Sequence, residues 1–141
     1  MTGLELLRAV RSGDVPPPGF AVLLDLTLET VDQGHVVFGL TPGEQHLNPL
    51  GTVHGGLLAT MLDSAMGCAV QTMLPAGTSY TTVQLDVKYV RTSSLGGGQI
   101  RASGSVVHAG RRTATAEGQV HDARGRLCAH ATTTCLVLSG E

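Results

Sequence analysis

Residues 48–74 read NPLGTVHGGLLATMLDSAMGCAVQTML, and the long apolar segment in this stretch indicates how the rest of the chain is arranged. From residue 55 to residue 74 it is rich in helix-forming residues and contains no proline. This composition predicts one long helix, which Pro75-Ala76-Gly77 ends. Hydrophobic residues lie on nearly every side of the predicted helix, so it must be buried on most sides. The rest of the chain is therefore expected to wrap it.

Four long strands are predicted after the helix. Apolar and β-branched residues indicate strands at 80–91, 98–108, 112–122 and 127–138. In the first of these, polar and apolar residues alternate from 82 to 89, which predicts a polar outer face and an inner face against the helix. The short links at 109–111 and 123–126 predict hairpin turns, so neighbouring strands are expected to be antiparallel.

The residues before residue 48 add smaller elements. Residues 1–19 predict a short helix followed by a loop, because apolar residues recur at helical spacing before Gly13 and the run Pro16-Pro17-Pro18. The runs 20–28 and 35–40 predict a first β-hairpin. Together these elements predict an α+β architecture, with one curved antiparallel sheet of about six strands around one helix. We expect residues 1–141 to form a single domain.

Composition excludes several classes of function. The formal net charge is −2, only 3% of residues are aromatic, and there is no tryptophan. These values provide no basic surface or stacking platform for nucleic acid, and no attraction to an anionic membrane. The stretch 55–74 could span a bilayer by its length, but Asp63 at its middle argues against that location.

Cysteine and histidine usage point to a cytoplasmic protein without a metal. The three cysteines form no C-x-x-C pair, which favours a reducing compartment. The first ten residues lack the apolar run of a signal peptide. The histidines are scattered without metal-ligand spacing, so we expect no metal site.

Asp63 is the first candidate for chemistry. A carboxylate in the middle of an apolar helix costs several kcal/mol unless it is paired or lies in a functional site. One interpretation is a catalytic carboxylate. The alternative is that Asp63 faces a loop and only accepts local hydrogen bonds.

The start of the helix is the second candidate. His54-Gly55-Gly56 lies where first-turn amides have no partner within the helix and the helix dipole is positive. Without a Cβ atom, either glycine lets a ligand oxygen approach its amide, as the developing oxyanion of a thioester would. Alternatively, the two glycines only permit a sharp turn into the helix.

The spacing of these two candidates indicates that a second copy of the chain takes part in the site. Asp63 follows His54 by nine residues, which is about 13 Å along one helix. One subunit therefore cannot easily bring its helix start and its own Asp63 to the same carbonyl carbon. A neighbouring copy could supply one of them.

The segment from Asn48 through His54-Gly55-Gly56 to Asp63 resembles the hotdog-fold acyl-CoA thioesterases of the phenylacetate-pathway and 4-hydroxybenzoyl-CoA type. The resemblance extends over about residues 20–138, including Val83-Gln84-Leu85-Asp86-Val87-Lys88-Tyr89-Val90 and Gly110-Arg111-Arg112. In the 4-hydroxybenzoyl type a Thr or Ser lies one turn beyond the carboxylate. Here that position is Gly67, so the phenylacetate-pathway branch fits better.

The resemblance implies an acyl-CoA hydrolase that assembles as a homodimer or homotetramer. It implies that Asp63 acts as nucleophile or general base, that the Gly55 amide polarises the thioester carbonyl, and that Asn48 orients water or the carboxylate. It also gives His54 a positioning role at the loop or near the thioester. Thr82, or its neighbour Thr81, is the candidate hydroxyl from the strand after the helix.

Coenzyme A would be bound as part of the substrate, and no other cofactor is expected. Gly56 is a further candidate for contact with the substrate. The phosphates need cations, and Arg91, Arg111 and Arg112 lie at predicted strand ends or turns, where they could also simply be solvated. Two other functions stay open: an acyl-CoA-binding hotdog without hydrolysis, and an enoyl-CoA hydratase or dehydratase. The sequence leaves the acyl group undetermined.

Overall fold

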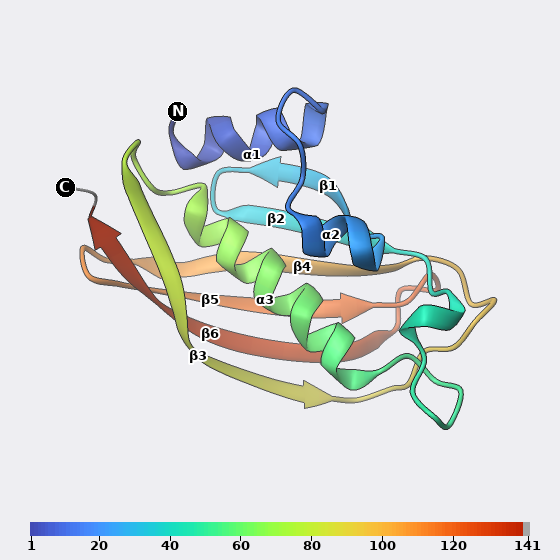
Figure 1. The fold of residues 1–141 in the computed structure, drawn as a ribbon. Coiled ribbons are helices and arrows are strands. Elements are labelled where there is room, and N and C mark those ends of the chain that lie inside the picture. The colour runs from blue at the N-terminus through green and yellow to red at the C-terminus, as the bar shows by residue number, and fades with distance from the viewer. Residues whose placement is uncertain (140–141) are drawn as a thin grey trace.

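The computed structural model describes residues 1–139, in which one long helix lies against a six-stranded antiparallel sheet (Figure 1). The helix, α3, spans Gly55–Gln71. The strands are β1 (Thr27–Asp32), β2 (His35–Leu40), β3 (Thr78–Tyr89), β4 (Ile100–Ala109), β5 (Thr113–His121) and β6 (Leu127–Ser139). Their order in the sheet is β1-β2-β4-β5-β6-β3, and every pair is antiparallel. The predicted α+β architecture is confirmed.

Helix α3 provides the centre of the hydrophobic core. The fully buried side chains on its sheet-facing side are Leu58, Met61, Leu62, Ala65, Met66, Ala69 and Val70. Gly104 on β4 lies directly beneath the backbone of Ala65, at a place where a Cβ atom would overlap the helix. The helix and the sheet therefore pack backbone against backbone at this point.

Strand β3 lies at an edge of the sheet, and its side-chain pattern differs from the predicted alternation. It does not join β4, the next strand in the chain, but forms a sheet edge by pairing with β6. Its register shifts between Thr82 and Gln84. Because this bulge inserts an extra residue, Thr82 faces α3 and Val83 is 58% exposed. The predicted alternation, with Val83 inward and Thr82 outward, is wrong at these two positions.

The predicted strand at 20–28 is also wrong. Residues Gly19–Leu24 form a short helix, α2, and β1 begins only at Thr27. The helix ends at Asp25, which adopts a left-handed conformation with φ 57°. Apolar runs of this length fit a buried helix turn as well as a strand, and α2 buries only Ala21.

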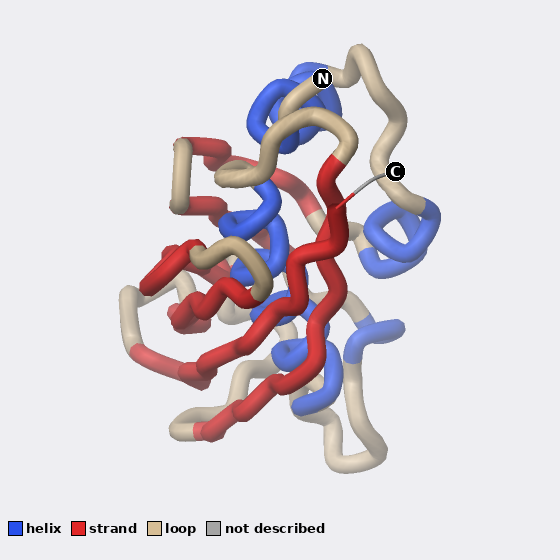
Figure 2. The backbone as a smooth tube through the Cα atoms, turned by 90° about the vertical axis from the view of Figure 1, so that its left-hand side faces the viewer, coloured by secondary structure: helices blue, strands red, loops and turns tan. Residues whose placement is uncertain are grey.

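The predicted N-terminal helix is confirmed as α1, Gly3–Ser12, which begins with a capping box between Thr2 and Glu5. Its first amide, on Gly3, donates to the Leu74 carbonyl oxygen at 3.0 Å, so α1 is attached to the end of α3. Figure 2 shows the sheet curving around the helices, which lie on its concave side. None of the helices in residues 1–139 has the length and apolar character needed to cross a membrane.

Candidate active site

Asp63 lies two turns into α3 and is half-buried. Thr82 Oγ1 on β3 donates a hydrogen bond of 2.8 Å to Asp63 Oδ1. The bulge in β3 makes this contact, because it turns Thr82 toward the helix. The predicted pair of carboxylate and strand hydroxyl is therefore brought together within one chain, by Thr82 and not by the exposed Thr81.

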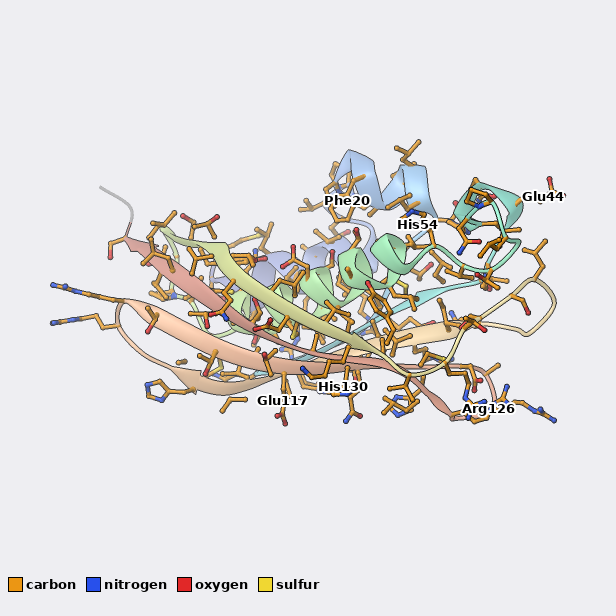
Figure 3. The ribbon with its side chains drawn as sticks, turned by 90° about the horizontal axis from the view of Figure 1, so that it is seen from below. Phe20, Glu44, His54, Glu117, Arg126 and His130 are labelled. Carbon is orange, nitrogen blue, oxygen red and sulfur yellow. The ribbon has the colours of Figure 1, made fainter. Side chains whose placement is uncertain are left out.

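A cavity of about 520 Å³ opens beside this pair. One stripe of α3 lines it, with Asp63, Ser64, Cys68 and Gln71, and β3 adds Tyr80 and Thr82. The opposite wall is apolar and comes mainly from the N-terminal segment: Leu6, Leu7, Val10, Val15, Pro16, Pro17, Pro18, Phe20, Ala21 and Leu26, with Leu28 and Phe38 from the sheet. Figure 3 shows Phe20 on the helical side of the sheet. The carboxylate is thus open to a mostly apolar pocket.

Two other titratable groups in this cavity stay protonated at neutral pH. Burial, with a smaller contribution from the negative charge of Asp63, raises the pKa of the Cys68 thiol to about 12. Burial also raises the pKa of the Tyr80 phenol, helped by Cys68, Cys135 and Asp63. Because a thiol is a poor nucleophile, Asp63 is the better candidate for attack or for base catalysis.

The beginning of α3 leaves one glycine amide open. His54 is the N-cap, and its Nδ1 accepts a 2.9 Å hydrogen bond from the Gly56 amide. The Gly55 amide makes no hydrogen bond within residues 1–139, whereas the His54 carbonyl accepts from Leu57 and Leu58. Those bonds polarise the peptide that carries the Gly55 N–H. Gly55 is therefore the amide available to a ligand, and Gly56 is occupied by the capping histidine.

Tyr89 is a site residue that the sequence analysis missed. Its Oη donates to the Gly55 carbonyl oxygen at 2.6 Å, and its ring would contact a Cβ atom at Gly55 at 3.3 Å. This contact joins the end of β3 to the first turn of α3. No local pattern in the sequence indicates this contact, because it depends on β3 crossing to the far edge of the sheet.

Asn48 holds the loop before α3 in shape. Its Oδ1 accepts from the amides of Leu50 and Thr52, and its Nδ2 donates to Thr52 Oγ1 at 2.8 Å. The buried His46 supports the same loop: its Nδ1 accepts from the Gly43 amide and its Nε2 lies 2.8 Å from the Leu24 carbonyl oxygen. In one chain, therefore, Asn48 contacts the loop rather than Asp63.

The three candidate arginines are exposed and lie at opposite ends of the sheet. Arg91 follows β3, whose last residue pairs with Ala129 near the start of β6. Arg111 and Arg112 form the β4–β5 turn near Leu136, about 24 Å farther along β6. Only Arg91 lies at the Gly55 end of the molecule, since Tyr89 contacts Gly55. The three cannot bind the same phosphates in one chain.

No cluster of three potential metal ligands occurs among residues 1–139. Glu117 and His130 lie on the outer face of the sheet, away from the helices and from Asp63 (Figure 3). The candidate chemistry of the site therefore lies at two places on α3, the stripe around Asp63 and the helix start at Gly55, which are about 12 Å apart along the helix.

Comparison with known proteins agrees with this geometry. The family described as Thioesterase superfamily matches residues 50–129, which include the start of α3, Asp63 and most of the sheet. The chain belongs to the thioesterase superfamily. It is 38% identical, over 124 residues, to a protein of Halobacterium salinarum whose name proposes esterase activity; the match covers 83% of this chain and 80% of the relative. This thioesterase is therefore a thioester hydrolase.

Further relatives extend the comparison to proteins of known fold. Mouse acyl-coenzyme A thioesterase 13 is 33% identical over 91 residues, which is 64% of each chain. The structure of a phenylacetic acid degradation-related protein from Ralstonia eutropha superposes with a TM-score of 0.83 at 29% identity, covering 92% of this thioesterase and 98% of that chain. A thioesterase-like protein of Streptococcus pneumoniae, solved with coenzyme A, has a TM-score of 0.74 at 28% identity and covers 82% and 88%. The predicted hotdog fold is confirmed.

Proposed function

We propose that this thioesterase hydrolyses an acyl-CoA to the free acid and coenzyme A. The observation that carries the proposal is the Asp63 carboxylate, which opens into an apolar cavity while Thr82 holds one of its oxygens. Asp63 Oδ2 makes no hydrogen bond within the described residues and is left for water or for a carbonyl carbon. A binding protein without hydrolysis has no need for such an oriented carboxylate.

The thioester carbonyl oxygen would bind at the Gly55 amide of a second copy of the chain. Within one copy, Gly55 and Asp63 are separated by about 12 Å of helix, so they cannot both contact one carbonyl group. Strand β3 supports the pairing of two copies, because it is an edge strand with an unpaired outer edge. Val83, Tyr89 and Val90 on or just after it are all more than half exposed, and apolar surface of this kind favours a partner. The assembly would be a homodimer or a homotetramer.

Coenzyme A is the proposed thiol because two relatives point to it. One is named as an acyl-coenzyme A thioesterase and the other was solved with coenzyme A. The exposed Arg91 lies at the same end of the molecule as Gly55, and its guanidinium suits a phosphate. We assign the phosphates to Arg91 in preference to Arg111 and Arg112. The reaction requires neither a metal nor another cofactor.

The chemistry can follow two routes from the same geometry. As a general base, Asp63 takes a proton from water while the water oxygen bonds to the carbonyl carbon. As a nucleophile, its carboxylate bonds to that carbon and forms an anhydride, which water then hydrolyses. In both routes the Gly55 amide stabilises the negative charge on the carbonyl oxygen, and the carbon–sulfur bond breaks to release coenzyme A as a thiolate. The thiolate takes up one proton, which comes from Asp63 in the base route and from the water that hydrolyses the anhydride in the nucleophile route.

Thiol release from a panel of aryl-acetyl, aroyl and medium-chain acyl-CoAs tests the proposal. Replacing Asp63 by Ala should lower turnover at least a hundredfold, as expected for the loss of a base or nucleophile, while the oligomer stays folded. Unchanged turnover of a good substrate would remove Asp63 from the mechanism. The matched control is Asp32→Ala, which removes an exposed carboxylate at the end of β1.

The alternative functions give different readouts in the same assay. Tight binding of acyl-CoA by the wild type, with no thiol released over hours, would favour a binding protein. A change in the absorbance of an enoyl-CoA without thiol release would favour a hydratase.

A further inference from the structure

The Tyr80 ring lies in the space that a side chain at position 67 would fill, next to the cavity. A Cβ atom at Gly67 would lie 2.7 Å from Tyr80 Oη and 3.0 Å from its Cε2 atom. Gly67 is one turn beyond Asp63 on the stripe of α3 that faces the cavity. The absence of a side chain there lets the tyrosine ring lie against the helix.

The Tyr80 phenol lacks a partner in the chain. Its Oη makes no hydrogen bond within residues 1–139, yet no fully buried polar side-chain atom in that range is left unsatisfied. The hydroxyl is therefore not fully buried, and the cavity that Tyr80 lines is where a ligand can reach it. Most of the surrounding wall is apolar, and a polar hydroxyl in such a place selects ligands that offer it a hydrogen-bond acceptor.

The position of Tyr80 relative to Asp63 sets where that acceptor must be. Thr82 contacts the carboxylate, and Tyr80 lies two residues earlier on the same face of β3, an advance of about 7 Å along the strand. The cavity continues along α3 from Asp63 to Gln71, about 12 Å. An acyl group that enters at Asp63 thus passes Tyr80 before it reaches the end.

We propose that Tyr80 determines acyl specificity by donating a hydrogen bond to a hydroxyl or oxo group about 7 Å from the thioester carbonyl carbon. This inference rests on the proposed function, because it takes Asp63 as the place of the carbonyl. The acyl group lies in the cavity of the subunit that supplies Asp63, under the wall formed by Pro16, Pro17 and Phe20. The polar group can be on a ring or on an aliphatic chain.

Two matched pairs of thioesters test the proposal. The aromatic pair is 4-hydroxyphenylacetyl-CoA and 4-methylphenylacetyl-CoA, and the aliphatic pair is 7-oxooctanoyl-CoA and 7-methyloctanoyl-CoA. Each pair differs by one polar atom in place of a methyl group. The measured quantity is the ratio of kcat/KM for the polar member to kcat/KM for the apolar member.

Tyr80→Phe should lower this ratio by about 2- to 12-fold in one of the pairs, the range for one neutral hydrogen bond. The pair that responds identifies the ring or the chain as the carrier of the polar group. The matched control is Tyr89→Phe, which removes a phenol outside the cavity and should leave both ratios unchanged. Unchanged ratios in Tyr80→Phe for both pairs would overturn the proposal.

Binding measurements separate the failure of this inference from the failure of the proposed function. Dissociation constants of the same four thioesters are measured by calorimetry in Asp63→Asn, with and without Tyr80→Phe. If the wild type hydrolyses the thioesters but Tyr80→Phe leaves the ratios of their dissociation constants unchanged, only the specificity role of Tyr80 is refuted. If Tyr80→Phe changes these ratios but the wild type releases no thiol, the proposed hydrolase function is refuted, while the proposed hydrogen bond from Tyr80 to the acyl group is supported.

Discussion

The two sides of helix α3 are built for different purposes. On the side facing the sheet, its residues are apolar, fully buried and in contact with a glycine that allows the backbones to touch. On the other side, Asp63, Ser64, Cys68 and Gln71 form a half-buried stripe along an open cavity. The first side gains stability from close packing. The second keeps polar groups accessible, so it can serve chemistry.

This contrast explains how an acidic residue can lie in an apolar helix. Asp63 does not enter the packed core, because the stripe at positions 63, 64, 67, 68 and 71 recurs at helical spacing on one side only. Changes on the sheet side should therefore affect folding. Changes on the cavity side and at the start of the helix should affect turnover.

Gly104→Ala should have the largest effect on folding. The new Cβ atom would overlap the backbone of Ala65, which cannot move without displacing the whole helix. We expect a loss of about 3 kcal/mol or more in the free energy of unfolding, measured by chemical denaturation. Gly19→Ala is the control, because no atom lies within 4 Å of its added Cβ. Equal stability of the two variants would contradict the described packing.

Tyr89→Phe should separate turnover from stability. It removes the hydroxyl that donates to the Gly55 carbonyl oxygen, and so loosens the first turn of α3. We expect kcat/KM to fall about 2- to 12-fold for all acyl-CoAs, since one hydrogen bond is lost. The midpoint of unfolding should hardly change, because Tyr89 is largely exposed. A loss of stability without loss of turnover would assign Tyr89 to folding instead.

Asp122→Asn should have the smallest effect, because the hydrogen bonds of Asp122 stay within the exposed β5–β6 turn. Asp122 accepts hydrogen bonds from the Arg124 and Arg126 amides and from Arg126 Nε in the β5–β6 turn. The backbone hydrogen bond from Arg126 is the main cause that holds the pKa of this carboxyl below its ordinary value of 3.8. A lowered pKa stabilises the folded state above the ordinary value, and this contribution is lost as the pH falls through the lowered one.

The check is the difference in unfolding free energy between wild type and Asp122→Asn as a function of pH. The wild type should be slightly more stable at neutral pH, and the difference should vanish in acid. A difference that stays constant down to the lowest pH would show that the charge of Asp122 is not responsible.

The sequence predicted the features that depend on local pattern. Helix α3 begins at the predicted Gly55, and four strands with their hairpin turns follow as expected, because helix-forming composition, apolar β-branched runs and turn residues encode them. The run 20–28 was misassigned, because a short apolar segment after Pro18 fits a helix or a strand equally well. Long-range pairing decided the rest.

The sequence indicates which residues are candidates for the site, but it does not indicate which of them contact one another. Asp63, Gly55 and Thr82 could be chosen from the sequence, but the choice of Thr82 over Thr81 depended on a bulge in β3. The Gly55 amide is free to bind a ligand because His54 caps the Gly56 amide, and the sequence does not show which of the two is capped. Gly67 was the one available signal for Tyr80, because a glycine inside a buried helix indicates a close neighbour.

In the proposed mechanism, Asp63 of one subunit and the Gly55 amide of another act on the same thioester. Mixing two inactive variants tests whether they do. Gly55→Pro removes the amide while keeping the helix, because proline is favoured at the first helical position and His54 already has the extended conformation that precedes proline. Gly55→Ala is the control that keeps the amide. The other partner is Asp63→Asn.

Each variant alone should release almost no thiol. After unfolding and refolding together, mixed dimers contain one intact site each, so about a quarter of the wild-type activity should return. Differently charged tags on the two variants establish that mixed dimers have formed. Mixed dimers that remain as inactive as their parents would show that Gly55 and Asp63 do not meet across subunits.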